Sequence, residues 1–224
     1  MTNGNSRPSH ELTWTTIEDE FANSVTHGIG LLLAIGGFCS LVVLTSYGGD
    51  LSHIMGCMVY GVSLVVLYGA STLYHFVRQP RLKKLLQTVD HVAIYFFIAG
   101  TYTPFTLVNL HGFWSWMLFG LVWGLGMMGI IAKITWGDRW GWLSVVAYLG
   151  LGWCCLIAAK PLLESVPMGA VLWLVAGGLA YSTGVIFFAF DYIRYFHAIW
   201  HVFVMAGSIC HFCAVIFYVV PTAT

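Results

Sequence analysis

The segment RYFHAIWHVFVMAGSICHFCAVIFYVV, residues 194–220, combines a long apolar run with two histidines near its start. A helix rises 1.5 Å per residue, so a run of this length can cross a bilayer core about 30 Å thick. His197 and His201 stand at positions i and i+4, where a helix places both imidazoles on one face. The segment therefore predicts a transmembrane helix that carries a polar site near one end.

Composition extends the membrane prediction to the whole chain. Of the 224 residues, 59% are hydrophobic and only 8% are charged, whereas soluble domains carry about 25% charged residues. The formal net charge is zero, which provides no basic surface for nucleic acid. We therefore expect membrane lipids, and not nucleic acid, as partners. The polar first twenty residues also lack the pattern of a secretory signal peptide.

Seven apolar runs follow one another along the chain, and each has the length of about 20 residues that spans a bilayer. None alternates in the manner of a β-barrel strand. The runs lie at about 25–47, 54–76, 87–109, 113–135, 140–159, 167–190 and 196–219. The sequence therefore predicts an all-α bundle of seven transmembrane helices over residues 20–220, with a polar cytoplasmic tail at 1–19 and a short outside tail at 221–224.

Basic residues predict the orientation, because lysine and arginine are enriched on the cytoplasmic side of a membrane. If the N-terminus is inside, Lys160 alone falls outside, against eight basic residues inside. These eight are Arg7, Arg78, Arg81, Lys83, Lys84, Lys133, Arg139 and Arg194. We expect a cytoplasmic N-terminus and an outside C-terminus.

In this orientation, polar residues from several helices gather near the cytoplasmic face. His75 ends the second run, Asp90 begins the third, and His197 and His201 begin the seventh. Ser71 precedes His75 by four residues and shares its face. Ionisable groups inside a membrane cost roughly 2.5–3.5 kcal/mol on insertion scales, so they persist where they pair or bind a ligand.

The first helix contributes a further polar face to the same layer. Glu20, Asn23 and His27 follow one another at spacings i, i+3 and i+7, which a helix brings to one side. His27 lies near the cytoplasmic start of the first apolar run. This polar face therefore falls in the same layer as the histidines of the second and seventh helices.

Three imidazoles at one depth are a suitable ligand set for Zn²⁺, which imidazole binds at about 2.0–2.1 Å. Three protein ligands leave a fourth position for water, whose pKa zinc lowers to about 7. Asp90 could then accept a proton from that water, and Ser71 could hydrogen-bond to the water or the substrate. The residues alone also allow a hydrogen-bonded proton relay or a structural network.

The six cysteines all lie within apolar runs, where cysteine usually acts as a small buried hydrophobe. Cys210-His211-x-Cys213 has the residue types of a metal motif. However, His211 follows His197 by fourteen residues, which is about 21 Å along a helix. We therefore do not expect His211 to share the metal site.

Four segments carry a resemblance to a known family. They are EFANSVTHGIG (20–30), STLYHF (71–76), DHVAIYFFIAGTYTPF (90–105) and HAIWH (197–201). In this order they resemble the bacterial hemolysin III proteins of the progestin and adiponectin receptor superfamily. That family is similar to alkaline ceramidases in its seven-helix architecture with an intramembrane zinc site.

The resemblance implies a zinc site built from three kinds of residue in a bacterial cytoplasmic (inner) membrane protein. The implied zinc ligands are His75, His197 and His201. The residues implied to contact the water on the metal are Asp90 and Ser71. The residues implied to support the ligands are Glu20, Asn23 and His27.

Three functions are compatible with such a site. We expect a zinc-dependent hydrolase that attacks the amide or ester carbonyl of a membrane lipid and so affects lipid homeostasis. The alternative is a membrane-state sensor or small-ligand receptor with structural zinc. The short outer loops of the chain argue against a large protein ligand, because a standard protein interface buries about 800 Å² of surface on each partner. A second alternative is a haemolysin-type cytolytic protein, although the permanently apolar runs argue against a secreted soluble toxin.

Overall fold

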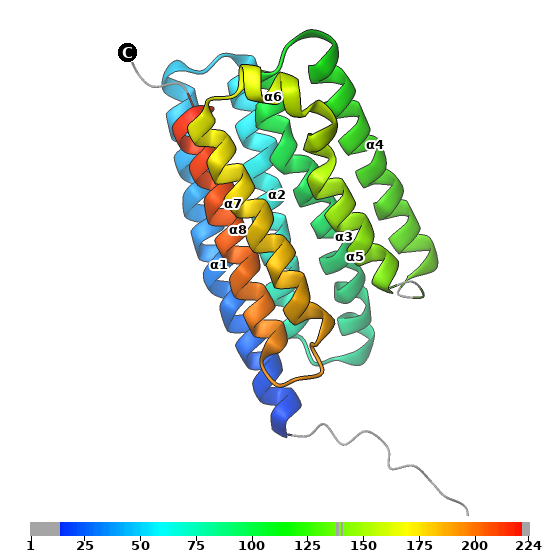
Figure 1. The fold of residues 1–224 in the computed structure, drawn as a ribbon. Helices are drawn as coiled ribbons and strands as arrows, with labels where there is room; N and C mark the ends of the chain where they lie inside the picture. Colours follow the sequence, from blue (N-terminus) through cyan, green and yellow to red (C-terminus); the bar gives the residue numbers. More distant parts are fainter. Residues whose placement is uncertain (1–13, 138, 140, 221–224) are drawn as a thin grey trace, which may run out of the picture.

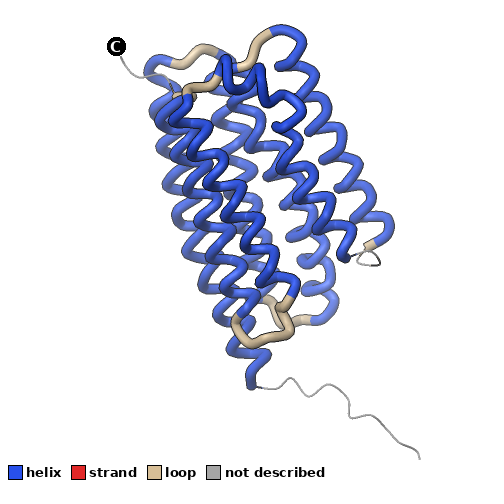
Figure 2. The backbone as a smooth tube through the Cα atoms, viewed as in Figure 1, coloured by secondary structure: helices blue, strands red, loops and turns tan. Residues whose placement is uncertain are grey.

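The computed structural model describes residues 14–137, 139 and 141–220. This part of the chain is helical with short connections and contains no strand (Figure 2). It contains seven segments that are long and apolar enough to cross a membrane. The expected all-α, seven-span fold is therefore confirmed for the described residues. Residues 1–13 of the expected polar tail and the expected tail at 221–224 lie outside them.

The helices follow one another in up-and-down order (Figure 1). The first four spans are α1 (Trp14–Gly48), α2 (Leu51–Phe76), α3 (Pro80–Pro104) with the π-helical turn Phe105–Asn109, and α4 (Gly112–Trp136). The last three are α5 (Gly141–Gly152) with the 3₁₀ segment Trp153–Ala158 and α6 (Ala159–Ser165), then α7 (Met168–Ala189) and α8 (Phe196–Tyr218). The start of α1 and the end of α8 lie at opposite ends of the bundle.

Two helices begin well before their apolar runs. Helix α1 begins at Trp14, within the segment expected to be a polar tail, and α3 begins at Pro80, within the basic loop between the second and third runs. Proline suits the first position of a helix because its φ is already helical and no N–H is needed there. The apolar runs therefore mark the membrane-spanning part of each helix and not its full length.

The polar start of α1 is tied to the loop between α7 and α8. Glu18 forms an ion pair with Arg194, and the Tyr195 backbone N–H donates to Asp19 Oδ1 at 3.2 Å. Tyr195 has a φ of 64°, a left-handed conformation that is uncommon for residues other than glycine. These contacts fix the chain where it turns into α8, just before His197.

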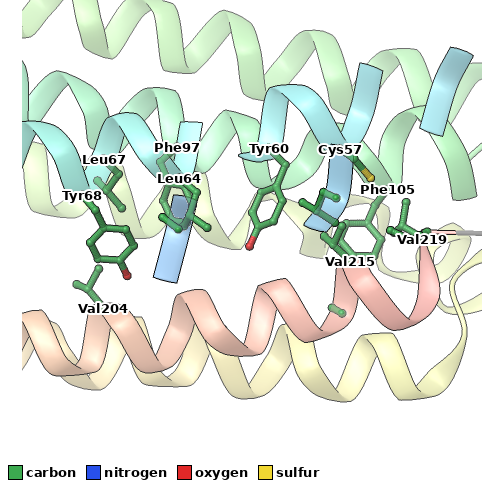
Figure 3. Packing of buried hydrophobic residues seen from close by; sticks show 14 of the residues in the cluster. Cys57, Tyr60, Leu64, Leu67, Tyr68, Phe97, Phe105, Val204, Val215 and Val219 are labelled. Atoms are coloured by element: carbon green, nitrogen blue, oxygen red, sulfur yellow. The ribbon is translucent and has the colours of Figure 1, made fainter. Parts of the chain in front are cut away.

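The core forms where α2 faces α8 and their neighbours. Tyr68 lies next to Val204 in Figure 3, and Tyr60 is fully buried. Apolar side chains also cover the outer surface, where lipid would surround them. Examples are Leu32, Met128 and Leu172, which are each more than 60% exposed.

Candidate metal centre

Three histidines from two helices converge at the end of the bundle where α1 begins. One ring nitrogen from each of His75, His197 and His201 lies within 4.8 Å of the others. The ring centroids are 5.1 Å apart for His75 and His197, 5.0 Å for His75 and His201, and 4.7 Å for His197 and His201. Among the described residues, this is the only such group of three or more potential ligands, and it could hold one metal ion.

Glu20 on α1 determines which nitrogen of His75 is available. The His75 Nδ1 atom lies 2.8 Å from Glu20 Oε2. A carboxylate can only accept, so Nδ1 carries the hydrogen and Nε2 carries the lone pair. That Nε2 is buried and has no hydrogen-bond partner within the described structure. Lys83 Nζ lies 3.1 Å from the same Glu20 oxygen and holds the carboxylate in place.

The backbone of α1 fixes His201 in the same way. Its Nδ1 lies 3.2 Å from the carbonyl oxygen of Asn23 and 3.1 Å from Thr26 Oγ1. The carbonyl can only accept, so Nδ1 is the donor and Nε2 again carries the lone pair. The His27 ring stacks on His201 with centroids 3.5 Å apart and an interplanar angle of 18°. A hydrogen bond to the second ring nitrogen is typical of metal-ligating histidines.

His197 is the most accessible of the three histidines. Its side chain is 24% exposed, against 3% for His75. Its Nδ1 lies 3.8 Å from Asp191 Oδ2, which is an ion-pair distance and too long for a direct hydrogen bond. Three converging imidazoles, two of them with fixed tautomers, fit Zn²⁺, so the residues present match the expected metal.

Two pockets meet at the histidines. A pocket of about 260 Å³ is lined by Glu20, Asn23, His75 and His197, together with residues of the α7–α8 loop. A larger cavity of about 620 Å³ runs inside the bundle, and its lining includes both His197 and His201. The metal site therefore lies between a small polar pocket and a large apolar cavity. The apolar lining of the cavity includes Leu67, Phe97, Val171 and Leu174.

Asp90 and Ser71 lie on the cavity side of the histidines. Both line the cavity, and the buried Ser71 hydroxyl hydrogen-bonds to the Asp90 carboxyl group. Asp90 is not one of the converging ligand atoms. Lys133 on α4 is 4% exposed and acts electrostatically on Asp90. Asp90 is thus near the metal position without belonging to the ligand group.

All eight residues singled out from the sequence lie at or beside this site. Asn23 contributes through its backbone carbonyl, whereas its side-chain oxygen is buried without a hydrogen-bond partner within the described structure. Sequence reasoning did not identify four further residues that contact the site. They are Thr26, Lys83, Lys133 and Asp191. In the sequence the two lysines serve as topology signals, and their positions next to the polar layer also mark them as candidates for the site.

Comparison with known proteins gives matches along nearly the whole chain. The family model described as haemolysin-III related matches residues 15–212. Hemolysin-3 of Bacillus cereus is 43% identical over 208 residues, which cover 93% of this chain and 95% of that protein. The Hemolysin-3 homolog of Bacillus subtilis (strain 168) is 42% identical over 205 residues, which cover 92% and 96%. The monocyte to macrophage differentiation factor of Homo sapiens is 28% identical over 217 residues, which cover 93% and 88%.

Proposed function

This chain belongs to the haemolysin-III-related family, and on that premise we propose that it is a zinc-dependent lipid hydrolase of the bacterial cytoplasmic membrane. The membership confirms the resemblance that the four sequence motifs indicated, and the seven apolar helices make the chain a multi-pass membrane protein. The observation that carries the proposal is the convergence of three histidines beside a large apolar cavity that also contains Asp90.

The chemistry of the site follows from its ligand set. When bound, zinc would polarise a carbonyl oxygen and lower the pKa of a water in its open position to about 7. Glu20 and the Asn23 carbonyl keep the Nδ1 hydrogens of His75 and His201 away from the centre. This arrangement holds the two imidazoles in the orientation that a metal requires.

Asp90 is the group available to move a proton. Its carboxylate accepts a proton from the attacking water as the water oxygen bonds to the lipid carbonyl carbon. Asp90 then returns the proton to the leaving amine or alcohol when the C–N or C–O bond breaks. The hydrogen bond from Ser71 holds the carboxylate in one orientation during both transfers.

The two pockets suit the two reactants. Ligand pockets commonly have volumes of about 300–1,000 Å³, and the cavity of about 620 Å³ has the size and apolar lining for an acyl chain. Its lining extends to Leu110 and Val166, next to loops at the far end of the bundle. The smaller polar pocket beside His75 and His197 offers water a separate route to the same centre.

A membrane-state sensor with structural zinc is the second candidate. One observation favours it: the site joins α1, α2 and α8, because Glu20 contacts His75 and Asn23 contacts His201. A metal ion held there would lock three helices together. In that case the metal would be needed for stability but not for turnover.

The test is a turnover measurement on purified protein in lipid nanodiscs. The nanodiscs would contain ceramides, phospholipids and acyl amides, and fatty acid release would be measured with and without a zinc chelator. We expect release that stops with the chelator and returns when zinc is added back. The matched control is the His201→Ala protein, which should release nothing. Wild-type protein that holds zinc but hydrolyses no lipid in the panel would contradict the hydrolase and favour the sensor.

A further inference from the structure

A second polar cluster lies farther along the bundle than the three histidines of the candidate metal site. The Tyr68 hydroxyl on α2 donates to Ser208 Oγ on α8 at 2.8 Å, and the Tyr181 hydroxyl on α7 lies 3.0 Å from the same oxygen. His211, one turn farther along α8, has its ring centroid 5.4 Å from that of Tyr181. Tyr181 and His211 both line the cavity.

The hydrogen bonds of this cluster leave one donor and one acceptor for the cavity. The His211 Nδ1 atom lies 3.0 Å from the Gly207 carbonyl oxygen, which can only accept, so Nε2 carries the lone pair. Ser208 accepts from Tyr68 and can pass its own hydrogen to Tyr181. The Tyr181 hydroxyl hydrogen is then available to a ligand in the cavity, which the His211 ring also lines.

Two glycines make room for these rings. A side chain at Gly177 on α7 would collide with the His211 ring, and a Cβ at Gly207 on α8 would come within 2.6 Å of the Tyr181 ring. Each helix therefore has a glycine at the point where the ring of the other helix packs. This packing holds the donor and the acceptor in a defined position on the cavity wall.

The depth of the pair can be estimated from the helix rise. His211 follows His201 by ten residues on α8, which is about 15 Å along the helix axis. This distance from the metal site is close to the length that the acyl chains of one leaflet fill, which is half of a hydrocarbon core of about 30 Å. A polar pair at this depth is costly unless it is satisfied, and apolar residues such as Leu174 and Phe97 share the lining.

We propose that Tyr181 and His211 bind a hydroxyl group carried far along the acyl chain of the substrate. The inference rests on the proposed function, in which the cavity holds the acyl chain with its carbonyl at the histidines. A hydroxyl group donates one hydrogen bond and accepts another, as His211 Nε2 and the Tyr181 hydroxyl require. A methylene group can do neither. The substrate class is therefore lipids with a hydroxylated acyl chain.

Equilibrium binding of fatty acids to the purified full-length protein tests this inference without relying on turnover. The probes are octadecanoate, 12-hydroxyoctadecanoate and 6-hydroxyoctadecanoate, which differ only in the presence and position of the hydroxyl group. We expect wild-type protein to bind the 12-hydroxy acid about tenfold more tightly than octadecanoate, the effect of one to two net hydrogen bonds. The 6-hydroxy acid should gain no such advantage, because its hydroxyl lies short of the pair.

Variants of the pair identify the residues responsible. Tyr181→Phe and His211→Leu should each reduce the preference for the 12-hydroxy acid to about threefold or less, since each removes one hydrogen bond. The matched control is Tyr148→Phe, which removes another cavity-lining hydroxyl that donates to the His91 carbonyl oxygen. It should keep the full preference. Octadecanoate affinity shows that each variant still folds with an intact cavity.

Three results would overturn the inference, and they differ in what they imply for the hydrolase. Equal wild-type affinity for all three acids would remove the hydroxyl site and leave the hydrolase standing. A preference that survives in both Tyr181→Phe and His211→Leu would assign the hydroxyl to other residues. If wild-type protein does not bind octadecanoate, the cavity does not hold an acyl chain, and the hydroxyl-binding inference fails. The proposed hydrolase function would then be tested by the chelator experiment alone.

Discussion

The Nδ1 atom of His75 on α2 lies 2.8 Å from Oε2 of Glu20 on α1, which keeps its Nε2 atom free to face the other two histidines. Loss of a carboxylate partner of a metal-bound histidine typically costs 10- to 100-fold in metal affinity. We therefore expect Glu20→Gln to bind zinc about 10- to 100-fold more weakly, as measured by competition with a chromophoric chelator. The exposed Glu164→Gln variant should match wild type. Unchanged affinity in Glu20→Gln would separate Glu20 from the metal.

Thr26→Val should have a smaller effect on the same measurement. The variant removes one of two acceptors of the His201 Nδ1 hydrogen, while the Asn23 carbonyl remains. One net hydrogen bond of about 1 kcal/mol corresponds to a loss of zinc affinity of about fivefold. Thr135→Val, on the exposed face of α4, is the control and should not change the affinity. If Thr26→Val lost as much zinc affinity as Glu20→Gln, the Thr26 hydroxyl would be a more important partner of His201 than the Asn23 carbonyl.

Asp90→Asn should separate catalysis from metal binding. Asparagine can keep a hydrogen bond with Ser71 but cannot accept a proton from water. We expect the variant to fold, keep most of its zinc and lose at least about a hundredfold of the fatty acid release rate. Asp50→Asn is the matched control, because Asp50 caps α2 at the opposite end and asparagine caps a helix equally well. Undiminished hydrolysis by Asp90→Asn would remove Asp90 as the base.

The orientation of the bundle is tested by reporter fusions. With seven spans, the sequence places eight of the nine basic residues on the same side as the N-terminus, so we expect this side to be the cytoplasm. A reporter that is active only in the cytoplasm should be silent after Thr224 and active before Met1. The reverse pattern would move the histidine site to the outside.

The spans and the histidine cluster could be predicted from sequence because both depend on local periodicity. Apolar length predicts a span, and the i, i+4 spacing of His197 and His201 predicts a shared face. The alternation of basic loops then brings His75 to the same layer. These three steps need no knowledge of how the helices pack.

The remaining features depend on tertiary contacts that a residue pattern does not contain. Asn23 acts through its main chain, which no side-chain motif reveals. The early start of α1 is explained by the contacts of Glu18 and Asp19 with the α7–α8 loop. His211 lies outside the candidate ligand group, and its place beside Tyr181 depends on the crossing of α7 and α8.

The measurement that tests the central claim most directly is the zinc content per chain of the purified protein by elemental analysis. We predict one zinc per wild-type chain and a sharp loss in His201→Ala, because two ligands hold the ion far less well than three. His211→Ala is the matched control, since it removes another histidine of α8 outside the cluster, and it should keep its zinc. Full zinc in His201→Ala would contradict the proposed ligand set and make His27, which stacks on His201, the next ligand to test.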